Sequence, residues 1–136
     1  MSSIFTQIRK KEVTGQDIIY EDDKVFIFLA NKPHTEGHSL IMPVEEVGRF
    51  EELSPELFAY MSNIAQKYAK VLNQIYIPER IGMVIYGFEI DHVHIHIMPI
   101  WKDRGVWRSG DIPEVSIEEL NKVTEKIKAV ASEYLV

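Results

Sequence analysis

Cysteine is absent from this chain of 136 residues. Disulfide bonds, thiolate metal ligands and cysteine nucleophiles are therefore excluded. No apolar run approaches the roughly 20 residues that a membrane-spanning helix needs. The N-terminal stretch MSSIFTQIRKKEV also lacks the uninterrupted apolar core of a signal peptide. We therefore expect no association with a membrane and, by default, a cytoplasmic location.

Blocks of lysine and arginine are missing as well, and the formal net charge is −6. This balance argues against a nucleic acid polymer as the partner, although a local pocket in an acidic protein can still bind a small anion. The sequence contains no GxGxxG or GxxxxGK[ST] phosphate loop and no GxSxG nucleophile elbow. The familiar nucleotide-binding loops and serine hydrolases are thereby set aside.

The spacing of apolar residues predicts the order helix, three strands, helix, two strands, helix. Because the strands come in runs and do not alternate with helices one for one, we predict an α+β fold with an antiparallel sheet. The length predicts a single domain over 1–136, with a core of about 2–100 followed by a C-terminal loop and helix over 101–136. Helices are expected within 2–11, from Ser54 into 73–80, and within 116–135; strands are expected within 17–20, 24–30, 38–43, 81–87 and 92–100.

The segment IDHVHIHIMPI, residues 90–100, holds three of the five histidines in the chain. His92, His94 and His96 occupy every second position of an otherwise apolar run. Because side chains alternate across a strand, the three imidazoles are expected to point the same way, and the apolar residues between them into the core. This arrangement predicts a row of imidazoles on an open face of the sheet.

Three interpretations of the row compete. The first is a solvated polar face, which does not explain three histidines in register. The second is a metal site, but same-face neighbours along one strand are ~6.6 Å apart and do not readily converge on one ion. Two of them would need help from another side chain, such as His38, Glu89 or Asp91. The third is a catalytic histidine that attacks phosphorus while its neighbours donate hydrogen bonds to phosphate oxygens, and this is the leading hypothesis.

Several motifs resemble one family. HVHIHIM matches the His-φ-His-φ-His-φ-φ signature of the histidine triad (HIT) superfamily, where φ is apolar. GHSLIMP, residues 37–43, resembles the Gly-His-x-Leu-φ-φ-Pro strand of that family. IIYEDDKVFIFL and SIFTQIRKKEV resemble its opening hairpin and its N-terminal helix. The resemblance covers roughly residues 2–100, in the order of the family.

The resemblance implies a five-stranded antiparallel sheet with flanking helices, which dimerises into a ten-stranded sheet. It also implies hydrolysis or nucleotidyl transfer at the α-phosphate of a small nucleotide or nucleotide conjugate, through a covalent nucleotidyl-histidine and with no cofactor or metal. Carried over residue by residue, His94 is the nucleophile, His92 and His96 flank it, and His38 packs near the site.

The chain departs from the family at a zinc site that many bacterial members carry. The positions that correspond to its two cysteines and one of its histidines are Ser3, Thr6 and Glu46, so that only His92 remains of the four ligands. We therefore predict no zinc. The chain resembles a bacterial-type variant branch that lacks the zinc-binding cysteines.

It also departs where the family binds substrate. Ala30 replaces the residue that holds the ribose, and the adjacent Asn31 can substitute only if its loop shifts. Phe88 and Glu89 replace a glutamine and a serine or threonine near the phosphate. Because of these departures, a non-catalytic nucleotide-binding or regulatory dimer with the same fold remains a rival interpretation. A metal-binding protein that uses the histidine row is a third interpretation.

Two further features are ambiguous. Trp101 and Trp107 bracket a basic loop after the histidine row, so Trp101 is a candidate for stacking on a base, while a dimer contact explains the loop equally well. His34 is most simply an exposed loop residue.

Overall fold

The computed structural model describes residues 2–104 and 112–135. Its centre is a five-stranded antiparallel sheet in the order β1-β2-β3-β5-β4, as the resemblance implies. Trp107 lies outside the described residues. The elements are α1 (Ile4–Arg9), β1 (Tyr20–Glu21), β2 (Val25–Leu29), β3 (Ser39–Pro43), η1 (Phe50–Glu52), α2 (Pro55–Tyr76), β4 (Arg80–Ile85), β5 (Ile95–Ile100), η2 (Lys102–Arg104) and α3 (Ile117–Ala131).

Each α-helix begins at a serine cap. The hydroxyl oxygens of Ser3, Ser54 and Ser116 accept hydrogen bonds from main-chain N–H groups three residues further on. Such caps satisfy donors that the first turn of a helix leaves unpaired. Helix α2 ends at Ile77, which adopts the left-handed conformation with φ of 47°.

All five strands are shorter than the ranges expected from the sequence, and the difference is most important at β1 and β5. The strand expected over 17–20 is reduced to β1 (Tyr20–Glu21), and β5 begins only at Ile95. The main chain before Ile95 bonds elsewhere: the N–H of Val93 donates to the oxygen of Val47, at 2.7 Å, instead of extending the ladder. His92 and His94 therefore precede β5, and only His96 lies within it.

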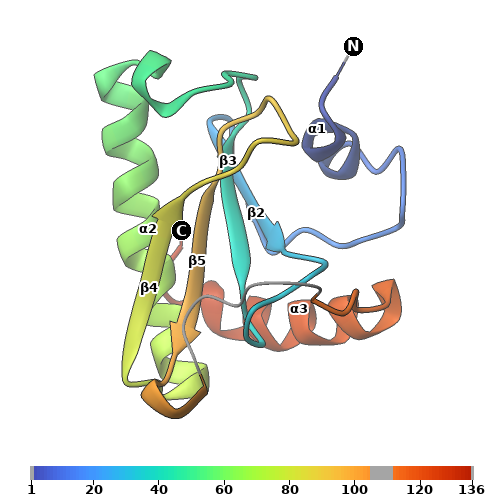
Figure 1. Cartoon of the computed structure of the whole chain (residues 1–136), viewed down its shortest axis with the longest axis vertical. Coiled ribbons are helices and arrows are strands. Elements are labelled where there is room, and N and C mark those ends of the chain that lie inside the picture. Colours follow the sequence, from blue (N-terminus) through green and yellow to red (C-terminus); the bar gives the residue numbers. More distant parts are fainter. Residues whose placement is uncertain (1, 105–111, 136) are drawn as a thin grey trace.

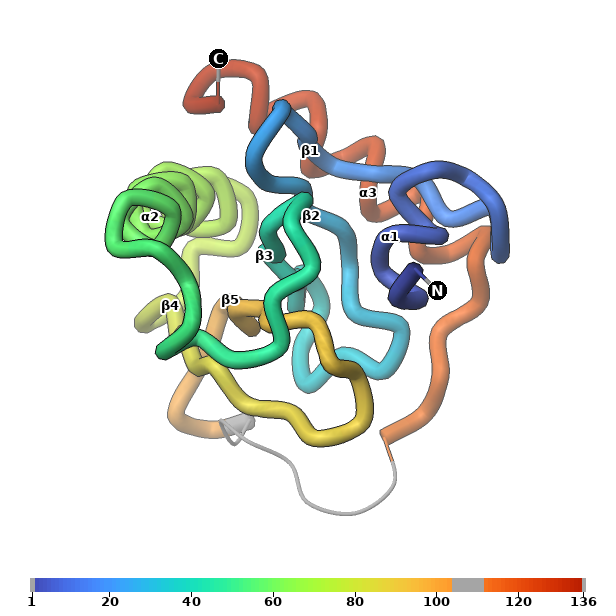
Figure 2. The backbone as a smooth tube through the Cα atoms, turned by 90° about the horizontal axis from the view of Figure 1, so that it is seen from above, coloured from blue at the N-terminus to red at the C-terminus, as the bar shows by residue number. Residues whose placement is uncertain are grey.

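The helices form layers on both faces of the sheet. Helices α2 and α3 cover one face, and α1 covers the other near the start of β5 (Figures 1 and 2). As predicted, Val93, Ile95 and Ile97 point into the core beneath α2 and α3. The expectation of an open histidine face is wrong at His92, which is fully buried because α1 lies over it.

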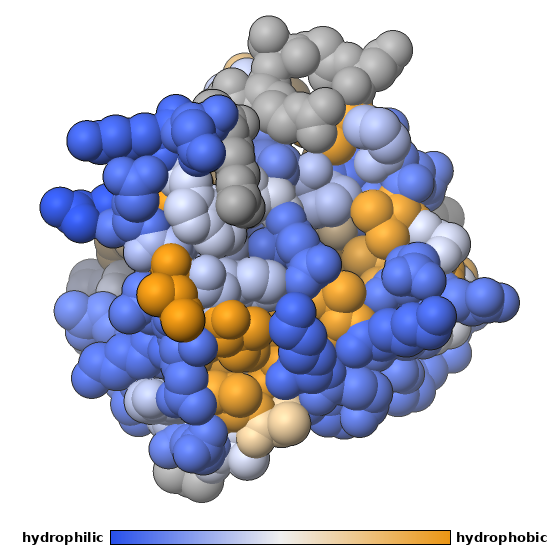
Figure 3. Space-filling view, turned by 90° about the horizontal axis from the view of Figure 1, so that it is seen from below, coloured by the Kyte–Doolittle hydropathy of each residue, from blue (hydrophilic) through white to orange (hydrophobic). Residues whose placement is uncertain are grey.

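The remaining surface is mixed. At the end of the molecule opposite α1 and the β4–β5 loop, Figure 3 shows small hydrophobic patches among hydrophilic side chains. Within residues 2–104 and 112–135, no helix has the length and apolar character that crossing a membrane requires. The cytoplasmic location stays a prediction.

Candidate active site

His92 anchors the histidine row from beneath α1. Its Nε2–H donates to the main-chain oxygen of Pro43 at 2.7 Å, and its Nδ1 lies 2.5 Å from the hydroxyl of Ser3. Both ring nitrogens are therefore engaged within the protein. What His92 presents to its neighbour is its main-chain oxygen.

His94 has the geometry of a nucleophile. Its Nδ1–H donates to the main-chain oxygen of His92 at 2.9 Å, which assigns the proton to Nδ1 and leaves the lone pair on Nε2. Phe5 of α1 packs edge-on against the ring, with 4.9 Å between centroids. On the Nε2 side, the main chain of Gly87 lies so close that a Cβ atom there would stand 3.3 Å from Nε2.

His38 and His96 form a polarised pair beside His94. The main-chain N–H of His34 donates to His38 Nδ1 at 3.0 Å, so the proton of neutral His38 is on Nε2. That Nε2–H faces His96 Nδ1, also at 3.0 Å. His96 in turn donates from Nε2 to the main-chain oxygen of Tyr86 at 2.9 Å. The two tautomers are thus fixed by backbone groups at either end.

The environment favours neutral imidazoles. Burial, reinforced by the neighbouring imidazoles, lowers the pKa of His38 to about 3 and that of His96 to about 4. Burial also lowers the pKa values of His94 and His92, against the opposing effect of their hydrogen bonds to main-chain oxygens. At neutral pH the row therefore carries no charge, and His94 retains the lone pair that attack on phosphorus requires.

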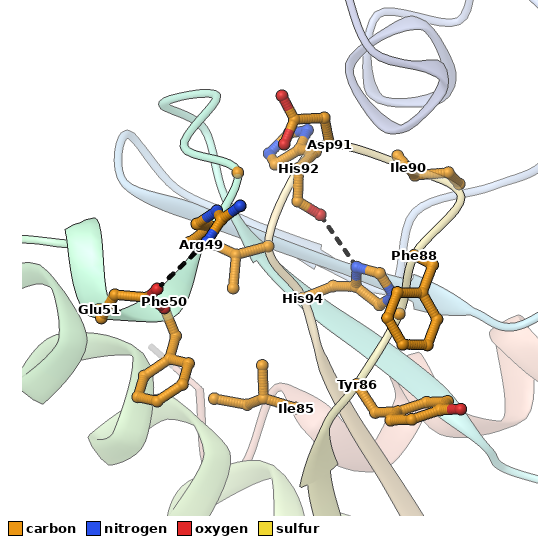
Figure 4. A pocket seen from close by; sticks show the side chains of 13 residues that line it. Arg49, Phe50, Glu51, Ile85, Tyr86, Phe88, Ile90, Asp91, His92 and His94 are labelled. Atoms are coloured by element: carbon orange, nitrogen blue, oxygen red, sulfur yellow. Dashed lines mark hydrogen bonds and ion pairs between the residues drawn. The ribbon is translucent and has the colours of Figure 1, made fainter.

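Two cavities meet at His94, separated by the segment 86–90. One, of about 400 Å³, extends toward the loop after β2. The other, of about 410 Å³, extends toward η1, where Arg49 pairs with Glu51 at 3.7 Å (Figure 4). Figure 4 shows the His94 imidazole beside Phe88, turned toward the β4–β5 loop. The first cavity is lined by Phe5, Ala30, Asn31, Lys32, His34, His38, Leu40, Tyr86, Gly87, Phe88, Glu89, Ile90, His94 and His96.

Most of the predicted substrate residues meet in the first cavity. His38, Asn31, Phe88 and Glu89 all line it, Phe88 with 88% of its surface exposed. The side-chain amide of Asn31 also donates to a Glu114 carboxylate oxygen at 3.2 Å. Trp101 lies beyond the far end of β5 and lines a separate cavity of about 210 Å³.

Several residues of this cavity were not expected from the sequence. His34 was assigned to an exposed loop, yet it lines the cavity together with Phe5 of α1 and Lys32. Gly87 contributes close backbone approach, and Tyr86 contributes its main-chain oxygen. Gly87, which lies between Tyr86 and Phe88, could have indicated this loop from the sequence. The role of the Tyr86 main-chain oxygen could not be predicted, because every residue type has such an acceptor.

The metal interpretations do not fit these donors. Among the described residues, no group of three or more histidine, aspartate or glutamate side chains is placed to hold an ion. The four positions that correspond to the zinc site of the family do lie together, but they bond to one another. Ser3 contacts Thr6 and His92, and its main-chain N–H donates to Glu46 at 3.0 Å. Neutral hydroxyls are not ligands that zinc prefers, so this set does not fit the metal.

Comparison with known proteins identifies the family. Residues 11–103 match the sequence profile of the HIT domain. An uncharacterized HIT-like protein of Methanocaldococcus jannaschii is 30% identical over 125 residues, which cover 88% of this chain and 95% of that protein. An adenosine 5'-monophosphoramidase of Schizosaccharomyces pombe is 30% identical over 135 residues, covering 94% and 100%. A Hit-like protein involved in cell-cycle regulation from Bartonella henselae superposes with a TM-score of 0.80 at 24% identity, covering 95% and 96%. The chain belongs to the histidine triad (HIT) family.

Proposed function

We propose that the protein is a nucleotide hydrolase or nucleotidyl transferase that acts at the α-phosphate of a nucleotide conjugate through a covalent nucleotidyl-His94 intermediate. The observation that carries this proposal is the 2.9 Å hydrogen bond from His94 Nδ1–H to the His92 main-chain oxygen. It leaves the lone pair on Nε2, at a cavity large enough for a small ligand. The phosphoramidase activity named for the fission yeast relative is of the same class.

The chemistry follows from the tautomers. His94 Nε2 attacks phosphorus, a P–N bond forms, and the bond to the leaving oxygen or nitrogen breaks. The imidazole becomes cationic in this step, and the His92 oxygen stabilises that charge by accepting the Nδ1–H. The leaving group takes its proton from the substrate itself, while the Nε2–H of neutral His96, once the Tyr86 oxygen releases it, donates a hydrogen bond to the leaving oxygen or nitrogen. Water or another acceptor then attacks the phosphoimidazole, releasing the nucleotide and restoring neutral His94.

A substrate panel tests the proposal. Wild type is assayed with adenosine and guanosine phosphoramidates and with dinucleoside polyphosphates, beside His94→Ala and His94→Asn. Asparagine retains an N–H donor near the His92 oxygen but has no nucleophilic nitrogen. We expect at least a thousandfold loss of kcat in both variants, and an acid-labile nucleotidyl adduct on wild type alone, read by mass spectrometry. Turnover that survives in both variants would overturn the role of His94.

A non-catalytic nucleotide binder is the second candidate, because the first cavity contains Ala30, Phe88 and Glu89. Ala30 provides no polar group for a ribose, and Glu89 adds a negative charge beside a phosphate site. This candidate predicts that wild type and His94→Asn bind nucleotide with similar affinity while neither turns over any member of the panel. Isothermal titration with AMP and GMP measures that binding directly.

We also propose that the chain forms a homodimer through β4. This strand is at the edge of the sheet, and its Met83 is 57% exposed. A cavity of about 570 Å³ between α2 and β4 is lined by Ala59, Ala69, Ile81 and Met83, among others. Antiparallel pairing of two β4 strands would continue the sheet to ten strands and cover this apolar surface.

Light scattering coupled to size exclusion tests the dimer. We expect wild type at twice the chain mass, and Met83→Lys at the mass of one chain with unchanged circular dichroism. Ile77→Lys is the matched control, since Ile77 is 80% exposed but lies outside the β4 cavity. A monomeric wild type at 50 μM would contradict the proposal.

A further inference from the structure

We propose that Ser3, which precedes the first helix and lies outside both His94 cavities, is a positioning residue for His94. Its hydroxyl holds the ring of His92, and the main chain of His92 holds the nucleophile. The inference rests on the proposed function of His94 and extends the catalytic machinery to the N-terminal helix.

The direction of the hydrogen bonds is fixed by geometry. His92 Nε2 must donate, because its partner is the main-chain oxygen of Pro43. Neutral His92 therefore has its lone pair on Nδ1, and the Ser3 hydroxyl, 2.5 Å away, is the donor to it. His92 is 0% exposed, so removal of the hydroxyl leaves Nδ1 without a donor unless a water enters the space that the hydroxyl vacates.

Ser3 itself is held from two sides. Its hydroxyl oxygen accepts from the main-chain N–H of Thr6 at 3.2 Å, and its own main-chain N–H donates to Glu46. Hydrogen bonds from Thr6 and from the Ser3 main chain hold the pKa of the Glu46 carboxyl below its ordinary value, so this anchor is ionised at neutral pH. The hydroxyl is thus fixed to the first turn of α1 and to the segment that follows β3.

Two contacts of His94 depend on this junction. The His92 oxygen accepts its Nδ1–H at 2.9 Å, and Phe5 of α1 packs on its ring and, with centroids 5.7 Å apart, on the ring of His92. The Ser3–His92 bond joins α1 to His92 and thereby fixes both contacts together. Without it, the His92 ring has a buried unpaired nitrogen, and the His92 main chain and Phe5 can shift independently. A displacement of the nucleophile by a fraction of an ångström lowers the rate of attack without changing substrate binding.

The simpler role for Ser3 is that of a helix cap, and three substitutions separate the two roles. Ser3→Gly removes the hydroxyl but remains an acceptable cap, Ser3→Ala removes both functions, and Ser3→Thr retains both. Positioning predicts that kcat falls about tenfold in the glycine and alanine variants alike, with KM within about twofold, and that threonine restores it to within about threefold. Ser2→Gly is the matched control, because the bond that ties Ser2 to α1 uses its main-chain oxygen.

A second readout does not depend on turnover. The ¹⁵N shifts of the His94 imidazole report which nitrogen holds the proton, and wild type is expected to have it on Nδ1. We expect Ser3→Gly and Ser3→Ala to populate the other tautomer as well. A glycine variant with the kcat and the ¹⁵N shifts of wild type, beside a weakened alanine variant, would show that Ser3 is only a cap. If wild type turns over no substrate, the proposed function fails, and the ¹⁵N shifts still decide the role of Ser3.

Discussion

His38 Nε2 and His96 Nδ1 lie 3.0 Å apart, and the proton between them belongs to His38. The assignment follows from the main-chain N–H of His34, which occupies His38 Nδ1 as a donor. His96 therefore accepts from His38 and directs its own Nε2–H to the Tyr86 oxygen. The imidazole beside His94 is thus preset as a hydrogen-bond donor.

Removal of His38 is expected to impair catalysis more than binding. In His38→Ala, His96 Nδ1 loses its donor and the ring can adopt the other tautomer, so we expect kcat to fall about tenfold. His38→Gln places an amide N–H near the position of Nε2 and should retain kcat within about threefold. Steady-state kinetics on the best substrate of the panel measure both. Equal losses in the two variants would contradict a role in setting the tautomer.

The sequence predicted the fold and the histidine row because both depend on local patterns. Serine caps precede the apolar periodicity of each α-helix, and alternation places Ile95 and Ile97 in the core. The short turn-prone segments between these elements indicated where one element ends and the next begins. These are signals that a single window of sequence contains.

The partners of the histidines could not be predicted in the same way. His92 bonds to Pro43 and His96 to Tyr86 through main-chain oxygens, which every residue type possesses. Helix α1 packs over His92 through a tertiary contact between Ser3 and His92, which are 89 positions apart in the sequence. The early end of strand pairing before Ile95 results from the competing bond of Val93 to Val47. Each of these depends on how distant segments meet, and not on local periodicity.

Acid should destabilise the protein through His38 and His96. Their pKa values lie at about 3 and about 4 in the folded state and near 6.5 when unfolded, so the unfolded state binds more protons between these values. The contribution of the two histidines to the free energy of unfolding is therefore fully present above pH 6.5. It falls as the pH is lowered, by up to about 1.4 kcal/mol per pH unit for each histidine. Urea denaturation from pH 7.5 to 4.5 measures the slope. His38→Gln should reduce it by the equivalent of one proton, and an unchanged slope would contradict the assignment.

Gly87 should tolerate no side chain. A Cβ atom there would lie 3.1 Å from His94 Cε1 and 3.3 Å from Nε2, so the imidazole or the β4–β5 loop must shift. We expect Gly87→Ala to lower kcat/KM at least tenfold with the free energy of unfolding within about 1 kcal/mol of wild type. Gly82→Ala is the control, since its Cβ would meet only the flexible end of Ile100, within the sheet. Full activity in Gly87→Ala would mean that the loop moves away from His94 before catalysis.

The cluster beneath α1 should accept zinc once its hydroxyls and carboxylate are replaced. Ser3 and Thr6 have their side-chain oxygens 3.4 Å apart, Ser3 reaches His92 Nδ1, and Glu46 borders the same cluster. Thiolates and imidazoles in these places would surround one ion with four ligands of the kind that zinc prefers. We expect the triple variant Ser3→Cys, Thr6→Cys and Glu46→His to bind one zinc per chain, measured by elemental analysis of tag-free protein. The double cysteine variant keeps the Glu46 carboxylate, a harder oxygen ligand, in the fourth place, and should bind zinc more weakly than the triple variant. If the triple variant binds no zinc and yet folds, these four side chains do not converge as the structure has them, and the anchoring of α1 through Ser3 would have to be reconsidered as well.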